Sequence, residues 1–385
     1  VVGGTTAFAR PPADGRMCGM EPPKISRRDS QSVSVGDVVI GGGAPVSVQS
    51  MTNTPTADAD ATAGQVRKLA DAGAELVRIA VPTREDSAAL TEIVRRSPVP
   101  IIADVHFHFD RALEAIDAGV AKIRLNPGNI DDREQVRGVI RAAADANVAI
   151  RVGVNAGSVV SRRDDSRRAE ELNRPMDELM VEKLADYLTV FEEERFTRLV
   201  LSAKSHDPYL CVLANRRLAE RWDYPLHLGV THAGPPETAV VRSSAMLGAL
   251  LMEGIGETIR VSIAGDPVQE VAVALELLWS LRLRQRRGVE LIACPTCGRL
   301  QTDILPILAE VRSRLADIDA PLTVAVMGCV VNGPGEADHA DVAICAGRGK
   351  AVLYSRGKRL RTVDAGEIAD AVEAETRRLA AETGG

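Results

Sequence analysis

The sequence has few aromatic residues and no long apolar run. Phenylalanine, tryptophan and tyrosine together make up 3% of its 385 residues, which argues against the aromatic platforms on which single-stranded nucleic acids stack. Its longest apolar stretches, such as residues 245–252, fall far short of the roughly 20 residues of a membrane-spanning helix. The net charge of −6 argues against a general polyanion-binding surface. We therefore expect neither a nucleic-acid partner nor membrane insertion.

Cysteine is also scarce, since six residues in a chain of this length are too few for a disulfide scaffold. The sequence therefore predicts a reducing, cytoplasmic compartment. Residues 1–34 contain many Gly, Pro and Arg residues and lack the apolar stretch of a secretory signal, so we expect a disordered tail there. The remaining chain has the composition of a globular protein, with 45% hydrophobic and 26% charged residues overall.

The chain from residue 35 onward alternates short, β-rich apolar runs with helical segments. Such alternation is typical of parallel βαβ units, and eight of these units predict a closed (β/α)8 barrel. The expected barrel domain spans residues 35–285, close to the roughly 250 residues of such folds. The expected strands are 46–49, 76–81, 100–105, 122–126, 149–155, 198–204, 226–231 and 258–263.

Residues 286–385 follow a different plan and predict a small α+β domain. Apolar residues at helical spacing, such as Ile304, Leu308 and Val311, indicate an amphipathic helix. The fold class is therefore α/β, a barrel with a second, C-terminal domain. The expected strands of this domain are 289–293, 322–327, 342–345 and 351–354, and the expected helices are 303–318 and 366–381.

Polar side chains near the ends of the expected barrel strands predict a binding pocket. Barrel strands are covered on both faces and should be almost wholly apolar. Several strands here nevertheless carry polar residues two or four positions apart, a spacing that places both on one face. Because barrel active sites form at the carboxyl ends of the strands, these side chains should converge. They are Arg78, Asp104, His106, Arg124, Asn126, Arg151, Asn155, Lys204, Arg260 and Ser262.

The charge of this expected pocket indicates its ligand. Five cations would face one carboxylate, and arginine forks with a lysine point charge suit phosphate or diphosphate oxygens. A single arginine at such a position is more often a salt bridge at the barrel rim, but five on five strands favour a site. His106 alone is as often a structural histidine as a catalytic one, and residues 126–129 have the composition of a simple turn.

Three cysteines lie in two Gly- and Pro-containing loops that follow expected strands of the C-terminal domain. Cys294 and Cys297 form a C-x-x-C pair, and Cys329 follows the next strand. Thiolates at this spacing bind one soft metal centre, and glycine amides can approach bound sulfides closely. The residues alone leave two centres open, an iron–sulfur cluster or a zinc site completed by Cys345 or His339.

Five segments carry more specific motifs: 48–54 (VQSMTNT), 123–129 (IRLNPGN), 151–157 (RVGVNAG), 294–297 (CPTC) and 327–337 (MGCVVNGPGEA). Through these motifs the chain, from about Val35 to its C-terminus, resembles a known enzyme family. That family is the iron–sulfur 4-hydroxy-3-methylbut-2-enyl diphosphate synthases of the non-mevalonate (MEP) isoprenoid pathway.

The resemblance implies a [4Fe–4S] cluster held by Cys294, Cys297, Cys329 and the carboxylate of Glu336. A carboxylate is a harder and more easily displaced ligand than a thiolate, so Glu336 would also control access of a substrate oxygen to iron. The implied substrate is 2-C-methyl-D-erythritol 2,4-cyclodiphosphate. Its reductive ring opening and dehydroxylation would yield 4-hydroxy-3-methylbut-2-enyl diphosphate, with the polar barrel residues lining the pocket.

The resemblance also implies partners. Flavodoxin or ferredoxin would supply electrons, and a homodimer would form in which the small domain of one chain covers the barrel of the other. The chain departs from the family after the seventh expected strand, where similar proteins read Thr-Glu-Ala-Gly and residues 231–234 read Thr-His-Ala-Gly. We expect His232 to replace that glutamate as a proton donor, with a different geometry and pKa.

Two other functions fit parts of the sequence. A barrel hydrolase or lyase acting on a phosphorylated small molecule, with a structural zinc domain, would work in air without an electron donor. A protein that only binds a phosphate-bearing ligand would keep its function after Glu336→Ala. In the reductive synthase, that substitution should abolish turnover.

Overall fold

The computed structural model describes residues 24–105, 109–125, 132–160, 171, 173–329, 335 and 338–383. The chain divides between Arg284 and Gln285 into two compact units, next to the boundary expected after residue 285. Each unit contains its own cluster of buried apolar side chains. The two units are therefore described separately.

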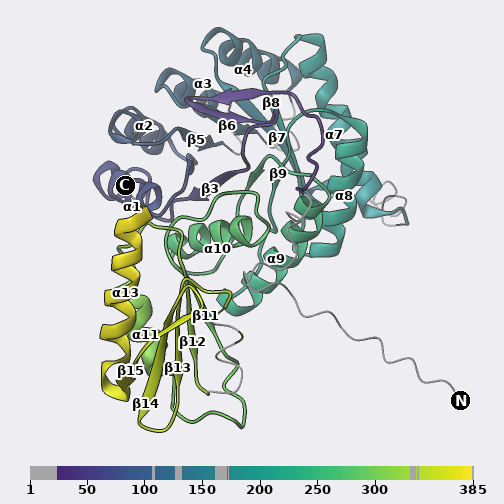
Figure 1. Cartoon of the computed structure of the whole chain (residues 1–385). Coiled ribbons are helices and arrows are strands. Elements are labelled where there is room, and N and C mark those ends of the chain that lie inside the picture. Colours follow the sequence, from purple (N-terminus) through teal and green to yellow (C-terminus); the bar gives the residue numbers. More distant parts are fainter. Residues whose placement is uncertain are drawn as a thin grey trace, which may run out of the picture. The chain divides into compact units, whose positions relative to one another are not determined.

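Eight parallel strands of the first unit form a barrel, which confirms the predicted fold (Figure 1). Their order is β8-β7-β6-β5-β4-β3-β10-β9, and a parallel bridge between Leu201 and Leu226 joins the two ends. The strands are β3 (Ser47–Met51), β4 (Leu76–Ala80), β5 (Ile101–Asp104), β6 (Lys122–Leu125), β7 (Ala149–Asn155), β8 (Leu199–Lys204), β9 (His227–Leu228) and β10 (Thr258–Ile259).

The last two barrel strands are shorter than the sequence predicts. β9 and β10 pair over two residues each. The apolar residues that follow them, Val230, Val261 and Ile263, are buried but lie outside the paired strands. The apolar runs at these positions therefore reflect burial against the surrounding helices and not continued strand pairing.

Helices surround the barrel strands (Figure 1). Side chains of Asp58, Thr83 and Asp207 accept hydrogen bonds from backbone N–H groups of the turns that follow them, and these caps determine where three of the helices begin. The helices of this unit are α1 (Ala59–Asp71), α2 (Arg84–Arg96), α3 (Phe109–Asp117), α4 (Arg133–Asp145), α5 (Ala156–Val159), α7 (Met176–Glu193), α8 (Pro208–Arg221), α9 (Pro236–Met252) and α10 (Pro267–Ser280).

A short antiparallel hairpin closes the amino-terminal end of the barrel. It consists of β1 (Val33–Val35) and β2 (Val38–Ile40). Val33, Val35 and Ile40 pack against Leu76 and Ala149, the first residues of two barrel strands. The barrel interior is therefore sealed by apolar side chains at this end.

Residues 24–34 belong to the segment expected to be a disordered tail, yet they pack against the barrel unit. Arg28 donates hydrogen bonds to the carbonyl oxygens of Trp222 and Tyr224 at 2.9 and 2.5 Å. It also pairs at 3.1 Å with Glu257, whose side chain is completely buried. The content of Gly, Pro and Arg suggested disorder, but here Arg28 supplies the counter-charge that a buried carboxylate requires. Residues 1–23 lie outside the described residues.

The second unit contains a five-stranded sheet in the order β11-β12-β13-β14-β15. The first three strands are parallel, and the last two run antiparallel to their neighbours. Two helices, α11 and α13, pack on one face of the sheet (Figure 1). The elements are β11 (Glu290–Ala293), α11 (Leu305–Arg314), β12 (Thr323–Met327), β13 (Val342–Ala346), β14 (Lys350–Ser355), β15 (Lys358–Asp364), the 3-10 turn η2 (Ala365–Glu367) and α13 (Ile368–Thr383).

The edge strand β15 was not predicted. Six of its seven residues are exposed, so its sequence lacks the apolar alternation by which a half-buried strand is recognised. None of the described helices combines the length and the apolar character needed to cross a membrane.

Candidate functional site

The carboxyl ends of the barrel strands enclose a cavity of about 150 Å³. It brings together eight of the ten side chains that the sequence places in a binding pocket. The other two, His106 and Asn126, lie outside the described residues. The eight are Arg78, Asp104, Arg124, Arg151, Asn155, Lys204, Arg260 and Ser262.

Strand register explains why these side chains meet. Asp104 lies opposite Arg124, and Arg124 lies opposite Arg151, in neighbouring parallel strands. Paired residues of adjacent strands point to the same face of a sheet, which here is the barrel interior. Their exposed fractions are 3%, 7% and 2%, so their charges are almost entirely removed from water.

Asp104 is the only carboxylate among the described residues that line the cavity. Its oxygens lie 3.1 Å from Nη1 of Arg124 and 3.6 Å from Nε of Arg78. Arg260 pairs with Glu270, which lies outside the described lining, so these two carboxylates balance the five cations only in part. The remaining positive charge is suited to an anion that carries several charges.

Burial makes these cations costly to keep charged. It lowers the pKa of Arg78 to about 10, a shift that Asp104 opposes and Arg260 increases. The pKa values of Arg151 and Lys204 lie well below their ordinary values, first because of burial and then because of neighbouring guanidinium groups. A bound polyanion would supply counter-charge and favour the charged forms of both side chains.

Met51 and Glu270, which the sequence analysis did not place in the pocket, contact two of its arginines. Sδ of Met51 lies 3.1 and 3.0 Å from Nε and Nη2 of Arg78, and 3.5 Å from Nη1 of Arg260. Glu270 on α10 accepts two hydrogen bonds from Arg260, both at 3.2 Å, and one from the N–H of Ile263 at 3.0 Å. Met51 ends a barrel strand and could have been found there, whereas Glu270 comes from a helix and carried no comparable signal.

Gly153, Ser202 and Thr231 complete the described lining of the cavity. Oγ of Ser202 accepts a hydrogen bond from Arg151 at 3.3 Å. A Cβ added to Gly153 would lie 2.1 Å from that oxygen, so only glycine fits beside it. Gly153 lies two positions from Arg151 on β7, and Ser202 lies two positions from Lys204 on β8. The spacing of two could therefore have identified both residues as well.

His232 follows the cavity residue Thr231. Its φ of 54° lies in the left-handed region, which costs a non-glycine residue about 1–3 kcal/mol. The side chain is exposed, and it is not among the described residues that line the cavity. The role of His232 as a proton donor therefore stays a prediction. Glu336, the other predicted catalytic residue, lies outside the described residues.

A second cavity, of about 90 Å³, lies next to the carboxyl ends of β11 and β12. Cys294, Cys297 and Cys329 all line it, as the sequence predicts. Sγ of Cys294 accepts a hydrogen bond from the N–H of Gly328 at 3.3 Å. A Cβ on Gly328 would lie 2.2 Å from the side chain of Leu300, so glycine allows Leu300 to pack against this loop. Hydrogen bonds from Arg299 lower the pKa of Cys297, which favours the thiolate.

Cys345 and His339 are two further candidate metal ligands predicted from the sequence. Cys345 is buried and belongs to the same apolar cluster as Cys294, whereas His339 is exposed. Within the described ranges, no three His, Cys, Asp or Glu side chains lie close enough together to bind a single metal ion. The three thiols that share the second cavity remain the candidate ligands of a larger centre.

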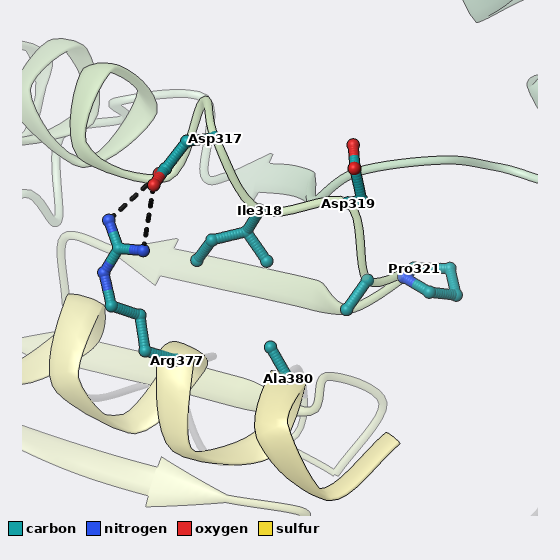
Figure 2. A pocket seen from close by; sticks show the side chains of 7 residues that line it. Asp317, Ile318, Asp319, Pro321, Arg377 and Ala380 are labelled. Carbon is teal, nitrogen blue, oxygen red and sulfur yellow. Dashed lines mark hydrogen bonds and ion pairs between the residues drawn. The ribbon is translucent and has the colours of Figure 1, made fainter. Parts of the chain in front are cut away.

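A third cavity, of about 500 Å³, lies between α13 and residues 317–321 (Figure 2). Arg377, which lines it, donates hydrogen bonds to both carboxylate oxygens of Asp317, at 2.9 and 3.1 Å. This ion pair balances the charge of the arginine, and Ile318 and Pro321 add apolar surface. The third cavity is therefore less suited to an anion than the mouth of the barrel.

Comparisons with known proteins cover both units. Residues 30–275 match the family model described as GcpE TIM-barrel domain, and residues 290–378 match the GcpE protein C-terminal domain. A 4-hydroxy-3-methylbut-2-en-1-yl diphosphate synthase (flavodoxin) of Salinispora tropica is 48% identical over 366 residues, which are 94% of this chain and 92% of the relative. The protein of the same name from Geobacter sulfurreducens is 47% identical over 353 residues, covering 92% of this chain and 98% of the relative.

Proposed function

Because the chain belongs to the GcpE family, which includes the 4-hydroxy-3-methylbut-2-en-1-yl diphosphate synthases, we propose that it makes the diphosphate for which these relatives are named. Its substrate would be 2-C-methyl-D-erythritol 2,4-cyclodiphosphate, an intermediate of the MEP pathway. Addition of two electrons and one proton opens the ring at the tertiary carbon, releases one hydroxyl as water and leaves the diphosphate with one more negative charge. The observation that carries the proposal is the barrel cavity, in which five cations face one carboxylate. That excess of positive charge suits a cyclic diphosphate.

The barrel residues bind and orient the diphosphate in this proposal. Asp104 forms ion pairs with Arg78 and Arg124, and Ser202 accepts a hydrogen bond from Arg151. These contacts position the guanidinium groups before the ligand binds. As the ring opens, the oxygen that leaves carbon gains negative charge, which the same groups stabilise. Asn155, Lys204, Arg260 and Ser262 line the same cavity and take part in binding, together with His106 and Asn126. His232 serves as a proton donor.

We also propose that Cys294, Cys297, Cys329 and Glu336 hold a [4Fe–4S] cluster. The three thiols line one cavity, and the N–H of Gly328 already donates a hydrogen bond to the sulfur of Cys294. Hydrogen bonds of this kind tune clusters held by thiolates. Bound there, the cluster would supply the electrons and a Lewis-acidic site for the departing hydroxyl. The resemblance of residues 327–337 to the family supports Glu336 as the fourth ligand.

The proposal also includes an electron donor, an oligomeric state and a cellular compartment. The names of the relatives include flavodoxin, which supports flavodoxin as the electron donor, with ferredoxin as the alternative. The family resemblance supports a homodimer in which the small domain of one chain covers the barrel of the other. Thiolate ligands require a reducing compartment, which supports the cytoplasm.

The first prediction tests the cluster by metal content. Protein prepared without oxygen should be brown, should bleach with dithionite, and should contain about four irons and four acid-labile sulfides per chain. Cys297→Ser should lose iron and colour while still binding the cyclodiphosphate in calorimetry, because Cys297 lines the cysteine cavity and not the barrel cavity.

Cys211, buried on α8 of the barrel unit, provides the matched control. Cys211→Ser should keep both iron and colour. Stoichiometric zinc without labile sulfide in the wild-type protein would refute the cluster and favour the hydrolase or lyase alternative.

A further inference from the structure

Two basic side chains lie inside the barrel, one layer below the cavity. Lys122 and His227 are the first residues of β6 and β9, and both are completely buried, with 0% of each residue exposed. Lys122 precedes the cavity residue Arg124 by two positions on the same strand. Because alternate residues of a strand share a face, Lys122 points into the barrel as Arg124 does. We call Lys122 and His227 the polar floor.

Neither member of the polar floor has a hydrogen-bond partner in the part of the chain that the structure describes. Nζ of Lys122 and both ring nitrogens of His227 are buried and unpaired. The hydroxyl of Thr258, directly opposite His227 on β10, is unpaired as well. An unpaired buried polar group costs about 1–3 kcal/mol. Side chains that serve only to pack the barrel would avoid this cost.

The charged groups that face the polar floor are cations. Arg151 on β7 and Arg78 on β4 face Lys122, and both also face His227. His227 is further surrounded by Lys204 on β8 and by Lys122 itself. Burial and these cations together lower the pKa of Lys122 and the pKa of His227 well below their ordinary values. Without an anion in the cavity, complete burial, the lack of a hydrogen-bond partner and the neighbouring basic groups therefore all disfavour the charged forms of Lys122 and His227.

The carboxylates of the region are engaged with other cations. Asp104 on β5 pairs with Arg78 and with Arg124 on β6. Glu270 on α10 pairs with Arg260 on β10. On the opposite side of the polar floor, the hairpin β1–β2 contributes apolar side chains. Glu257, next to Thr258, is paired with Arg28. With these carboxylates of the described residues engaged, a negative charge that stabilises protonated Lys122 or His227 would come from the cavity above them.

We propose that the polar floor takes up protons when an anion binds in the barrel cavity. Lys122 and His227 are neutral without ligand and become protonated when a polyanion binds above them. This inference deepens the proposed function and rests on it. A cyclic diphosphate brings two negative charges into a region that otherwise holds mostly cations, so protonating the floor becomes favourable. Ring opening adds a further negative charge to the diphosphate and strengthens the same effect.

Proton uptake determines how affinity depends on pH. A group whose pKa is higher in the complex than in the free protein takes up a proton between those two pKa values. In that interval binding weakens as the pH rises, by about tenfold per pH unit for each proton taken up. Outside that interval the group adds no pH dependence. Lys204, in the cavity itself, acts in the same direction, so variants are needed to separate its contribution.

The second prediction is tested by titration calorimetry of the cyclodiphosphate without a reductant, in buffers of different ionisation enthalpy. Neither phosphate of this ligand titrates near neutral pH, so the measured protons go to the protein. We expect uptake by the wild type, and smaller uptake with a shallower pH dependence in both Lys122→Met and His227→Gln. Lys68 is exposed on α1, so Lys68→Met should match the wild type.

Binding by the wild type without proton uptake would overturn this inference alone, as would equal uptake by Lys122→Met. Failure of the cyclodiphosphate to bind at all would overturn the proposed function and the inference with it. Should the variants not fold, NMR of labelled histidine in the wild type tests the same point, since the sequence has six histidines. At about pH 6, below the ordinary histidine pKa of about 6.5, one neutral imidazole should become cationic on binding. No such change would contradict the proposal.

Discussion

Asp104 illustrates how one side chain organises a strongly basic cavity. It contacts Arg78 and Arg124, which come from strands on either side of its own. One carboxylate does not neutralise the five cations of the lining. It does fix the direction of two guanidinium groups before a ligand arrives, which reduces the ordering that binding would otherwise require.

The third prediction concerns this carboxylate. Asp104→Asn removes the charge but keeps the shape of the side chain. We expect the free energy of unfolding to fall by about 3 kcal/mol, because one partner of a buried ion pair is left uncompensated. Sulfate should restore part of this loss by binding in the cavity of the folded state. Denaturant unfolding with and without sulfate measures both effects.

Asp186 on α7 provides the control for that experiment, since it is exposed. Asp186→Asn should leave stability nearly unchanged and insensitive to sulfate. A loss for Asp104→Asn no larger than that of the control would show that Asp104 does not organise the arginines.

The strands β9 and β10 lie very close together on one side of the barrel, and Gly229 makes this close approach possible. A Cβ on Gly229 would lie 2.5 Å from the carbonyl oxygen of Arg260 and 3.1 Å from Nζ of Lys204. The first contact is with backbone, which cannot move without displacing β10. The residue that follows β9 therefore links strand packing to the position of two cavity cations.

The fourth prediction follows from this contact. Gly229→Ala should destabilise the protein by about 1–3 kcal/mol, as overpacked cores do, and should weaken binding of the cyclodiphosphate because Arg260 and Lys204 move. Gly248→Ala adds the same methyl group on α9, where no atom lies within 4 Å of the new Cβ. It should be neutral or stabilising by up to about 1 kcal/mol. Equal stability of the two variants would contradict the steric argument.

The molecule consists of two units, each with its own buried apolar cluster. The barrel unit is closed at its amino-terminal end by the hairpin β1–β2 and is joined to the preceding segment through the ion pair of Arg28 with Glu257. All described residues of the anion cavity belong to this unit, and the cysteine cavity belongs to the other. The proposed function therefore places ligand binding and electron supply in different parts of the chain.

The fifth prediction is that a fragment of residues 24–284 folds cooperatively and binds the cyclodiphosphate with the proton uptake of the full chain. The same fragment should form no product with any reductant, because it lacks Cys294, Cys297 and Cys329. Thermal unfolding, calorimetry and a product assay measure these properties. A fragment that aggregates, or that binds no ligand, would show that the barrel needs the C-terminal unit to complete its site.

Local patterns in the sequence were enough to predict the eight barrel strands and most of the side chains that line the barrel cavity. Alternation along a strand assigns each residue to a face, so Arg124, Arg151 and Lys204 could be placed in one pocket without knowing any contact. The C-x-x-C spacing predicted the loop that lines the second cavity in the same way. The charged edge strand β15 escaped prediction because the only usable signal, buried apolar residues, is almost missing there.

Contacts between distant residues could be read only from the folded chain. Met51 meets Arg78, Glu270 meets Arg260, and Arg28 pairs with Glu257 across 229 residues. The polar floor belongs to the same class, because closure of the barrel surrounds His227 of β9 with basic groups of β4, β6, β7 and β8. The periodicity of a strand predicts the direction in which a side chain points. Strand order, register and burial determine which groups the side chain contacts and whether it carries a charge.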